Sequence, residues 1–284
     1  MKIKMKSIYI FNPIIFILIS LAFGKNKIRT IFVIGDSTAA QKDTKNGKVE
    51  RGWGMMLQNC FDKNYIKVDN HAVNGASSLS FYLGGRWKKV LQRIRPGDYV
   101  VIQFGHNDEK DGIKRHTDPG STFNEVLARY CNETRELGGI PILMNCVVRR
   151  NFAKNTYDNG DDEALRNTTY ADGVKVEEAD ILVDTHGDYR FAPITVSKEL
   201  NVYFVDANKI THELEQGLGV EGSKKLHMWF LPGQEPSEIK GKQDNTHYNI
   251  YGAQVIANLL ADGICEEIPE LKKYRKYNSS KGNL

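Results

Sequence analysis

The chain has 284 residues, of which 40% are hydrophobic and 26% charged, and its formal net charge is +4. This length suits one α/β domain with a sizeable core. Three of the lysines lie within the first six residues, and without them the net charge falls to +1. A nearly neutral chain gives no support for a nucleic-acid partner, which requires a concentrated basic face.

The N-terminus has the pattern of a secretory signal. The three lysines precede the mostly apolar stretch Ile8–Phe23, and Ala22 and Gly24 supply the small residues that a signal peptidase requires. The alternative is a membrane anchor, but the apolar core is short for a span of roughly 20 residues. We therefore expect a signal peptide at 1–24, one folded domain at 25–271 and a basic flexible tail at 272–284. The protein is then secreted or periplasmic, with no stable membrane insertion after cleavage.

Five short segments rich in Val and Ile predict strands that are buried on both faces of a sheet. They are Thr30–Ile34, Ile66–Asn70, Tyr99–Phe104, Ile140–Val147 and Val202–Val205. Apolar residues at helical spacing lie between and after them, in Gly54–Asp62, Phe81–Ile94, Phe123–Leu137, Asn208–Gly219 and Asn249–Asp262. Strands that alternate with helices predict βαβ units and a parallel sheet.

One segment breaks this alternation. Asn151–Asp188 is long, polar and weakly periodic, and a loop of this length is usually functional or mobile. Two interpretations stay open: a solvated surface excursion, or the rim of a binding site.

The four cysteines are widely spaced and match no zinc-binding pattern. They are Cys60, Cys131, Cys146 and Cys265. Buried free thiols and disulfides are equally compatible with their positions.

A Gly-Asp-Ser-Thr motif at 35–38 directly follows the first predicted strand. A serine on such a turn lies at the carboxyl edge of the sheet, where open α/β folds place their active sites. We predict Ser37 to be a nucleophile, which needs an adjacent base, and we expect a helix to start at this turn and place partial positive charge beside it. A turn or helix-cap role is the alternative for an isolated motif.

Asp244 and His247 lie three residues apart near the far end of the chain. They can supply the acid and the base of a Ser-His-Asp triad, whose members are recognised by role and not by order along the chain. Each also has a plainer interpretation, Asp244 as a turn residue and His247 as the start of a helix. The pairing with Ser37 favours the catalytic interpretation.

Two further polar segments follow predicted strands: Asn-His-Ala-Val-Asn-Gly-Ala-Ser-Ser at 70–78 and Gly-His-Asn-Asp at 105–108. With these motifs the chain resembles the SGNH (GDSL-like) hydrolases from about residue 31 to about residue 261, and within them the rhamnogalacturonan acetylesterases. The resemblance implies a flavodoxin-like three-layer α/β/α sandwich with a central parallel sheet of about five strands, in the order 2-1-3-4-5.

The resemblance also implies an oxyanion hole, formed by the backbone N–H groups of Ser37 and Gly75 and the side-chain amide of Asn107. Loss of one such donor typically costs about 3–4 kcal/mol of transition-state stabilisation. Asp36 and Asp108 are expected to brace the loops. Ala76 is a departure, because relatives often have Arg directly after this glycine, and the change affects the grip on an acidic polysaccharide.

Candidate sugar contacts are the pairs Arg86-Trp87 and Trp229-Phe230, because aromatic faces suit the apolar side of a pyranose ring. We predict Arg86, Trp229 and Tyr248 to bind substrate, whereas the helical spacing of Trp87 favours core packing. His71, His106 and His186 are not at a metal-ligand spacing, so we expect no metal, and no motif for a cofactor is present.

These observations predict an exported serine esterase that removes O-acetyl groups from a plant cell-wall polysaccharide through an acetyl-serine intermediate. Rhamnogalacturonan, the pectin backbone, is the first choice of substrate, by resemblance. Alternatives are an acetylxylan or other carbohydrate acetylesterase, a lipase or thioesterase on the same fold, and a catalytically silent carbohydrate-binding protein. We expect a monomer whose partner is its acetylated polysaccharide or oligosaccharide substrate.

Overall fold

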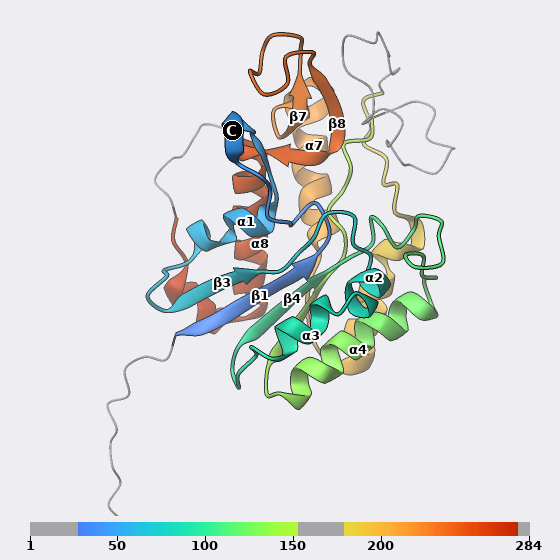
Figure 1. Ribbon diagram of the computed structural model, residues 1–284, viewed down its shortest axis with the longest axis vertical. Coiled ribbons are helices and arrows are strands. Elements are labelled where there is room, and N and C mark those ends of the chain that lie inside the picture. Colours follow the sequence, from blue (N-terminus) through green and yellow to red (C-terminus); the bar gives the residue numbers. More distant parts are fainter. Residues whose placement is uncertain (1–27, 153–178, 278–284) are drawn as a thin grey trace, which may run out of the picture.

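The structure, a computed structural model, describes residues 28–152 and 179–277. Its central sheet has five parallel strands in the order β3-β1-β4-β5-β6 (Figure 1). These are β1 (Arg29–Gly35), β3 (Ile66–Asn70), β4 (Tyr99–Gln103), β5 (Ile140–Met144) and β6 (Tyr203–Val205). Counted along the chain this is the order 2-1-3-4-5, so the predicted sheet is confirmed.

Side chains on the two faces of the sheet form separate cores. Within β1, Ile31 and Val33 join one core and Phe32 and Ile34 the other, because successive side chains of a strand point to opposite faces. Helices α1 (Trp53–Met56) and α8 (Ile250–Glu267) cover one face. The other is covered by α2 (Ser78–Leu83), α3 (Arg86–Leu91), α4 (Thr122–Glu136) and α6 (Ala192–Leu200). The result is the predicted three-layer sandwich.

Some predicted helices are divided in the structure. The predicted helix at 81–94 is two helices, α2 and α3, because Gly84 and Gly85 separate them and Gly85 has a φ of +69°, a conformation that glycine adopts readily. After α1 the chain continues as a 3₁₀ helix, η2 (Leu57–Cys60). A further helix, α7 (Ala207–Lys224), contains a kink at Gly219, where φ is +68°. The short 3₁₀ helices are η1 (Lys45–Gly47), η4 (Gly187–Arg190) and η5 (Pro269–Tyr274).

A second, antiparallel sheet lies at one end of the molecule and was not predicted (Figure 1). Its order is β2-β8-β7, with β2 (Glu50–Arg51), β7 (His227–Phe230) and β8 (Lys242–Asn249). Strand β8 is polar along most of its length and lacks the Val/Ile run by which buried strands are recognised. It leads directly into α8, so this sheet connects the C-terminal motif to the main core.

The C-terminal boundary predicted at residue 271 is wrong. Arg275 is 9% exposed, its Nε lies 2.8 Å from Asp262 Oδ1, and its backbone pairs with Phe61. Because a buried cation is retained only when it is paired, this segment belongs to the folded domain, which continues to residue 277 in the structure. The predicted signal peptide, the middle of the Asn151–Asp188 segment and the last seven residues lie outside the described residues.

All four cysteine side chains are buried and none is in a disulfide, which decides between the two interpretations of their positions. Within 28–152 and 179–277, no helix combines the length and the apolar character needed to cross a bilayer.

Candidate active site

Ser37 lies in a tight turn at the carboxyl end of β1. A side chain at Gly35 would place its Cβ 2.7 Å from the backbone oxygen of Gln103 on β4, so only glycine fits beside the neighbouring strand. Asp36 Oδ1 then accepts hydrogen bonds from Thr38 N (2.9 Å) and Thr38 Oγ1 (2.8 Å) and fixes the turn. No helix starts at this turn, since α1 begins only at Trp53, so the predicted helix dipole beside Ser37 is wrong.

Asp244 and His247 are brought to one side of β8 by an irregularity in the strand. Opposite β7, Asp244 pairs with Met228 whereas Tyr248 pairs with His227, so three residues of β8 bulge out between these pairs. Asp244 Oδ1 accepts hydrogen bonds from the backbone N–H groups of Thr246 and His247, both at 2.9 Å. In a regular strand, residues three apart point to opposite faces, and the bulge removes this restriction.

The three predicted triad residues form one hydrogen-bonded chain. His247 Nδ1 lies 2.9 Å from Asp244 Oδ2, and His247 Nε2 lies 2.9 Å from Ser37 Oγ. Burial alone would raise the pKa of the Asp244 carboxyl, but the His247 ring and two backbone N–H groups hold it below its usual value. A carboxylate fixed in the ionised form can orient the ring and stabilise an imidazolium.

The three predicted oxyanion donors lie on the loops that follow the adjacent parallel strands β1, β3 and β4. In the described part of the chain, neither the Ser37 N–H nor the Gly75 N–H has a hydrogen-bond partner. Gly75 is exposed and has a φ of +72°. Asn107, which follows β4, donates one Nδ2 hydrogen to Ala76 O at 3.1 Å, and an amide NH₂ has a second hydrogen to give.

Asp36 and Asp108 brace the loops, as predicted, and each is fully buried. Burial would raise the pKa of Asp36, but His106 and Thr38 lower it to about 2. Burial raises the pKa of Asp108 to about 7 against the hydrogen bonds from Ser78 and Thr117. Asp108 accepts from Ser78 N at 3.0 Å and from Thr117 Oγ1 at 2.9 Å, and so joins three loops.

A lysine–glutamate pair beside the site was not predicted. Lys42 is 8% exposed, and its Nζ lies 2.6 Å from Glu50 Oε1 and 2.8 Å from Asn74 Oδ1. Burial favours a raised pKa for Glu50, but attraction to His247 and Lys42 lowers it. Through Glu50 and Asn74, Lys42 therefore links strand β2, which pairs with β8, to the loop that carries Gly75. No local signal reveals this pair, because its members meet only in the fold.

The predicted sugar contacts have three different outcomes. Arg86 is exposed and lines a pocket that also contains Gly75. Trp229 is half-buried, donates from Nε1 to Asn245 Oδ1 at 2.7 Å, and has the cations of Arg150 and Lys224 each 4.9 Å from a ring. Tyr248 is fully buried, so the prediction that it binds substrate is wrong.

Strand and helix geometry explains why the side chains of Tyr248 and Trp87 are buried. Tyr248 lies just past the bulge, where β8 pairs again with His227 of β7 and Arg51 of β2, and its ring packs in the core that contains Ile31 and Val33. Trp87 packs in the other core, as predicted, and donates from Nε1 to Glu133 Oε2 at 2.6 Å.

Two histidines that are distant in the sequence meet in the fold. Ligand atoms of His106, Cys146 and His186 lie within 4.8 Å of one another, which sequence spacing did not reveal. His186 already uses both ring nitrogens, with Glu109 Oε2 at 3.0 Å and Val147 O at 3.1 Å. Burial raises the pKa of the Cys146 thiol well above its usual value. This donor set would bind a cation only after losing a hydrogen bond and a thiol proton.

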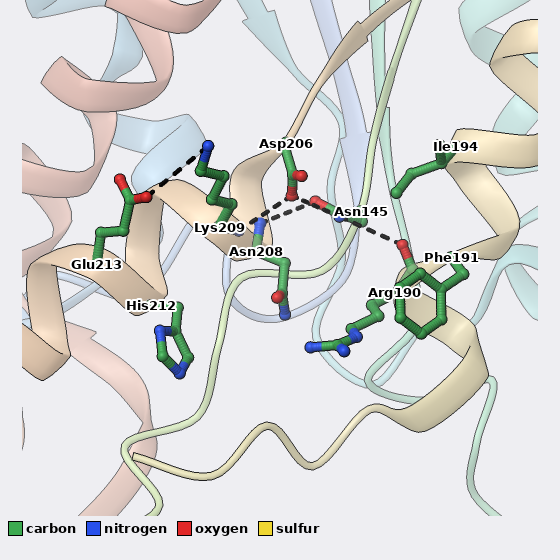
Figure 2. A pocket seen from close by; sticks show the side chains of 9 residues that line it. All are labelled: Asn145, Arg190, Phe191, Ile194, Asp206, Asn208, Lys209, His212 and Glu213. Carbon is green, nitrogen blue, oxygen red and sulfur yellow. Dashed lines mark hydrogen bonds and ion pairs between the residues drawn. The ribbon is translucent and has the colours of Figure 1, made fainter. Parts of the chain in front are cut away.

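Two pockets open on the described surface near the carboxyl ends of the strands. One, of about 430 Å³, is lined by the loop at Asn74–Ala76 and by Arg86 and Lys89 of α3. The other, of about 310 Å³, lies beside α6 and α7 (Figure 2). In the second pocket, Asp206 binds Asn145 at 2.8 Å and Lys209 lies 3.9 Å from Glu213, so much of its charge is internally paired.

A serine, a histidine and an aspartate joined by hydrogen bonds at the carboxyl edge of a flavodoxin-like sheet are typical of serine hydrolases. The chain belongs to the GDSL-like lipase/acylhydrolase family, whose model matches residues 33–255. Membership of this family makes the protein a carboxylic ester hydrolase.

Two relatives of known name are similar to almost the whole chain, both from Bacillus subtilis (strain 168). Rhamnogalacturonan acetylesterase RhgT is 35% identical over 83% of this chain and 89% of its own length. The probable rhamnogalacturonan acetylesterase YesY is 30% identical over 83% of this chain and 92% of its own length.

Solved structures resemble this fold. The crystal structure of YxiM from Bacillus subtilis has a TM-score of 0.65 at 24% identity and covers 84% of this chain, which spans only 57% of that chain. A mutant of Axe2, an acetylxylan esterase from Geobacillus stearothermophilus, has a TM-score of 0.51 at 19% identity over 84% of this chain and 93% of its own. At these identities the likeness concerns the fold.

Proposed function

We propose that the protein is an exported serine esterase that removes O-acetyl groups from rhamnogalacturonan. The observation that carries the proposal is the hydrogen-bonded chain from Ser37 Oγ through His247 to Asp244. In this proposal Ser37 is the nucleophile, His247 the base and Asp244 the orienting acid. The domain that performs the reaction includes the described residues 28–152 and 179–277.

Acylation begins when Ser37 Oγ attacks the acetyl carbonyl and its proton passes to His247 Nε2. The carbonyl oxygen becomes an oxyanion, which accepts hydrogen bonds from the N–H groups of Ser37 and Gly75 and from Asn107 Nδ2. The tetrahedral intermediate then collapses. His247 returns its proton to the departing sugar oxygen, and the acetyl group stays on Ser37.

Deacylation repeats these steps with water in place of the serine. His247 takes a proton from water, whose oxygen attacks the acetyl-serine carbonyl in the same oxyanion site. Collapse of the second intermediate releases acetate, and His247 returns the proton to Ser37 Oγ. The reaction consumes one water and regenerates the free hydroxyl, so the chain's own residues complete the cycle.

Three observations support the substrate and the location. The two Bacillus relatives that match most of the chain carry rhamnogalacturonan acetylesterase in their names, and the pocket beside Gly75 has cationic walls, which suit an acidic polysaccharide. Export is supported by the three lysines and the apolar stretch Ile8–Phe23 at the N-terminus.

The test is acetate release by the purified protein without residues 1–24, beside its Ser37→Ala variant. Substrates are acetylated rhamnogalacturonan, acetylated xylan, and aryl esters of two and eight carbons. We expect release that depends on Ser37, is fastest from rhamnogalacturonan, and is faster from the two-carbon than from the eight-carbon ester.

Each other outcome replaces one part of the proposal. Faster release from xylan keeps the mechanism and changes the polysaccharide, and preference for the eight-carbon ester indicates a lipase or thioesterase. Release that the Ser37→Ala change leaves intact would contradict the catalytic assignment. Binding of a polysaccharide with no turnover on any substrate would indicate a carbohydrate-binding protein.

A further inference from the structure

The side chains of Glu215 and His227 form a buried pair beside strand β8. Glu215 lies in α7 and His227 begins β7, and both side chains are fully buried. His227 Nε2 lies 2.9 Å from Glu215 Oε1. Within 28–152 and 179–277, Glu215 Oε2 and His227 Nδ1 have no hydrogen-bond partner, so this single bond must offset the burial of both groups. Such a pair adds little net stability, and the best-attested use of buried polar groups is to fix the register of neighbouring elements.

His227 lies at the irregularity that brings two triad residues together. It pairs with Tyr248, whereas the next residue of β7, Met228, pairs with Asp244. In a regular antiparallel ladder, Met228 would instead face His247, one residue back along β8. The residues between the two pairs therefore bulge out, and the pair of His227 with Tyr248 closes the bulge directly after the catalytic histidine.

Further contacts hold His227 to the segment that carries the base. Its ring packs against the Tyr248 ring, with centroids 4.9 Å apart. Its backbone oxygen accepts a hydrogen bond from Asn249 Nδ2 at 2.8 Å, and Asn249 Oδ1 caps α8 by accepting from Gly252 N at 2.9 Å. A Cβ at Gly252 would overlap Leu226 O, so the start of α8 packs directly against the start of β7. The position of His227 is therefore passed to Tyr248 and Asn249, which directly follow the base.

Helix α7 connects the two sheets on which the triad depends. The nucleophile follows β1 of the central sheet, whereas the base lies on β8 of the small sheet. α7 follows β6 of the central sheet (Figure 1), and Thr211 Oγ1 accepts a hydrogen bond at 3.0 Å from Val148 N, in the loop after β5. One turn further along the same face of the helix, Glu215 binds His227 of β7. The Glu215–His227 bond therefore holds the small sheet in place relative to the nucleophile.

We propose that Glu215 and His227 are positioning residues for the reaction: their buried hydrogen bond fixes the end of the β8 bulge and so keeps His247 within hydrogen-bond reach of Ser37. The inference rests on the proposed function and adds to it the part of the fold that holds base and nucleophile together. Both side chains are fully buried, so neither touches substrate. Loss of their bond should lower kcat and leave KM unchanged, because a displaced base affects the geometry of the reacting groups.

The test separates position from stability with four variants. Glu215→Leu removes one partner and leaves His227 unpaired in the core. Glu215→Gln keeps a hydrogen-bonding group of the same shape opposite His227. The double variant Glu215→Leu/His227→Phe removes both polar groups and keeps a ring against Tyr248. Thr211→Val is the matched control, because Thr211 is equally buried, lies one turn earlier on α7 and makes hydrogen bonds that do not involve β7.

The measurements are kcat and KM on a two-carbon aryl ester, and the urea midpoint of unfolding. We expect Glu215→Leu to lower kcat about ten- to a hundredfold, as for displacement of a catalytic group by about 1 Å, with KM within about twofold and a lower urea midpoint. Glu215→Gln should stay within about threefold of the parent, because a neutral hydrogen bond is weaker but keeps the geometry. The double variant should recover much of the midpoint, since no buried group is left unpaired, and yet keep the low kcat. Thr211→Val should lower the midpoint and leave kcat unchanged.

Recovery of both the urea midpoint and kcat in the double variant would mean that the pair contributes stability alone, and this would overturn the proposal. An unchanged kcat in Glu215→Leu, or equal losses of kcat in Glu215→Leu and Thr211→Val, would overturn it too. If Glu215→Leu does not fold, the double variant decides between these outcomes, because it contains no unpaired partner.

Failure of the proposed function gives a different result: the parent hydrolyses no ester, or Ser37→Ala leaves hydrolysis intact. The positioning role is then read from crystal structures of the parent and the double variant. A distance from Ser37 Oγ to His247 Nε2 that exceeds hydrogen-bond range in the double variant alone supports the role. The same distance in both proteins overturns it.

Discussion

Two aspartate–histidine pairs lie near Ser37, one on β8 and one on the loops that follow β1 and β4, and they differ in what surrounds them. In the first, His247 is 8% exposed, contacts Asp244 at 2.9 Å and has Ser37 Oγ 2.9 Å from its other nitrogen. In the second, His106 is 2% exposed and lies 3.2 Å from Asp36, and among residues 28–152 and 179–277 neither of its ring nitrogens has a hydrogen-bond partner. The residue types are the same, but only the first pair has a hydroxyl to act on.

The surroundings of each ring explain this difference. The His247 ring lies between an ionised carboxylate and a half-buried hydroxyl, so a proton can move along it. The His106 ring packs edge-on against His186, with centroids 4.5 Å apart, and the fully buried Asp36 is its charged neighbour. Burial lowers the pKa of His106 to about 4, against the attraction of Asp36, so this ring stays neutral and fills space between two loops.

The largest expected effect is a loss of kcat, which should be much greater when the carboxylate of Asp244 is removed than when that of Asp36 is removed. Asp244→Asn removes the group that orients His247, and we expect kcat on an aryl acetate to fall about 10³- to 10⁴-fold. Asp36→Asn keeps the His247 ring and its partners in place, and we expect a loss of less than about tenfold. Both are measured as steady-state kcat with the folded fraction checked by circular dichroism.

Similar losses of kcat in the two folded variants would contradict the division of roles between the pairs. Asp108→Asn serves as a further control, because Asp108 braces the same loops without contact to His247.

The second prediction concerns stability against pH. The pKa of His106 is about 4 in the folded protein, whereas an unfolded histidine has a pKa of about 6.5. Between these two pH values the unfolded state binds more protons. The free energy of unfolding therefore falls as the pH is lowered from about 6.5 to about 4. For His106 the loss is about 3 kcal/mol. Asp36, with a pKa of about 2, adds a further loss below pH 4.

The measurement is urea unfolding from pH 7 to pH 4 for the parent and for His106→Gln. We expect the free energy of unfolding to fall less steeply in the variant, because its buried amide does not titrate. His116→Gln is the matched control, since the His116 side chain is 37% exposed and should leave the slope unchanged. Parallel pH profiles of parent and His106→Gln would mean that His106 is not the buried group that titrates.

The two pairs also show what could be predicted from the sequence. Ser37, Asp244 and His247 stand in short local motifs, and the five sheet strands are Val/Ile-rich, so both could be identified from residue order. The position of Asp244 and His247 on a bulged strand could not be predicted, because β8 is polar and its irregularity arises from pairing with β7. The same omission explains the wrong prediction for Tyr248, because its burial depends on where β8 pairs with β2 and β7.

Contacts between distant segments were beyond local patterns. His106, Cys146 and His186 follow different parts of the chain and meet only because their loops leave the same edge of the sheet. Arg275 was assigned to a flexible tail on its charge, yet its partner Asp262 lies in α8. Composition describes a residue alone, whereas burial of a charge depends on a partner that the fold supplies.

The smallest effect should come from a third carboxylate, which tests whether His247 responds to Asp244 alone. Glu50 attracts His247 electrostatically and is held by Lys42 at 2.6 Å. A negative charge near the ring stabilises the imidazolium that forms during attack, so Glu50→Gln should reduce kcat on an aryl acetate about three- to tenfold. Asp43→Asn is the control, because Asp43 is exposed and pairs with Lys48. If Glu50→Gln and Asp43→Asn give the same kcat, the charge on Glu50 has no effect on the base.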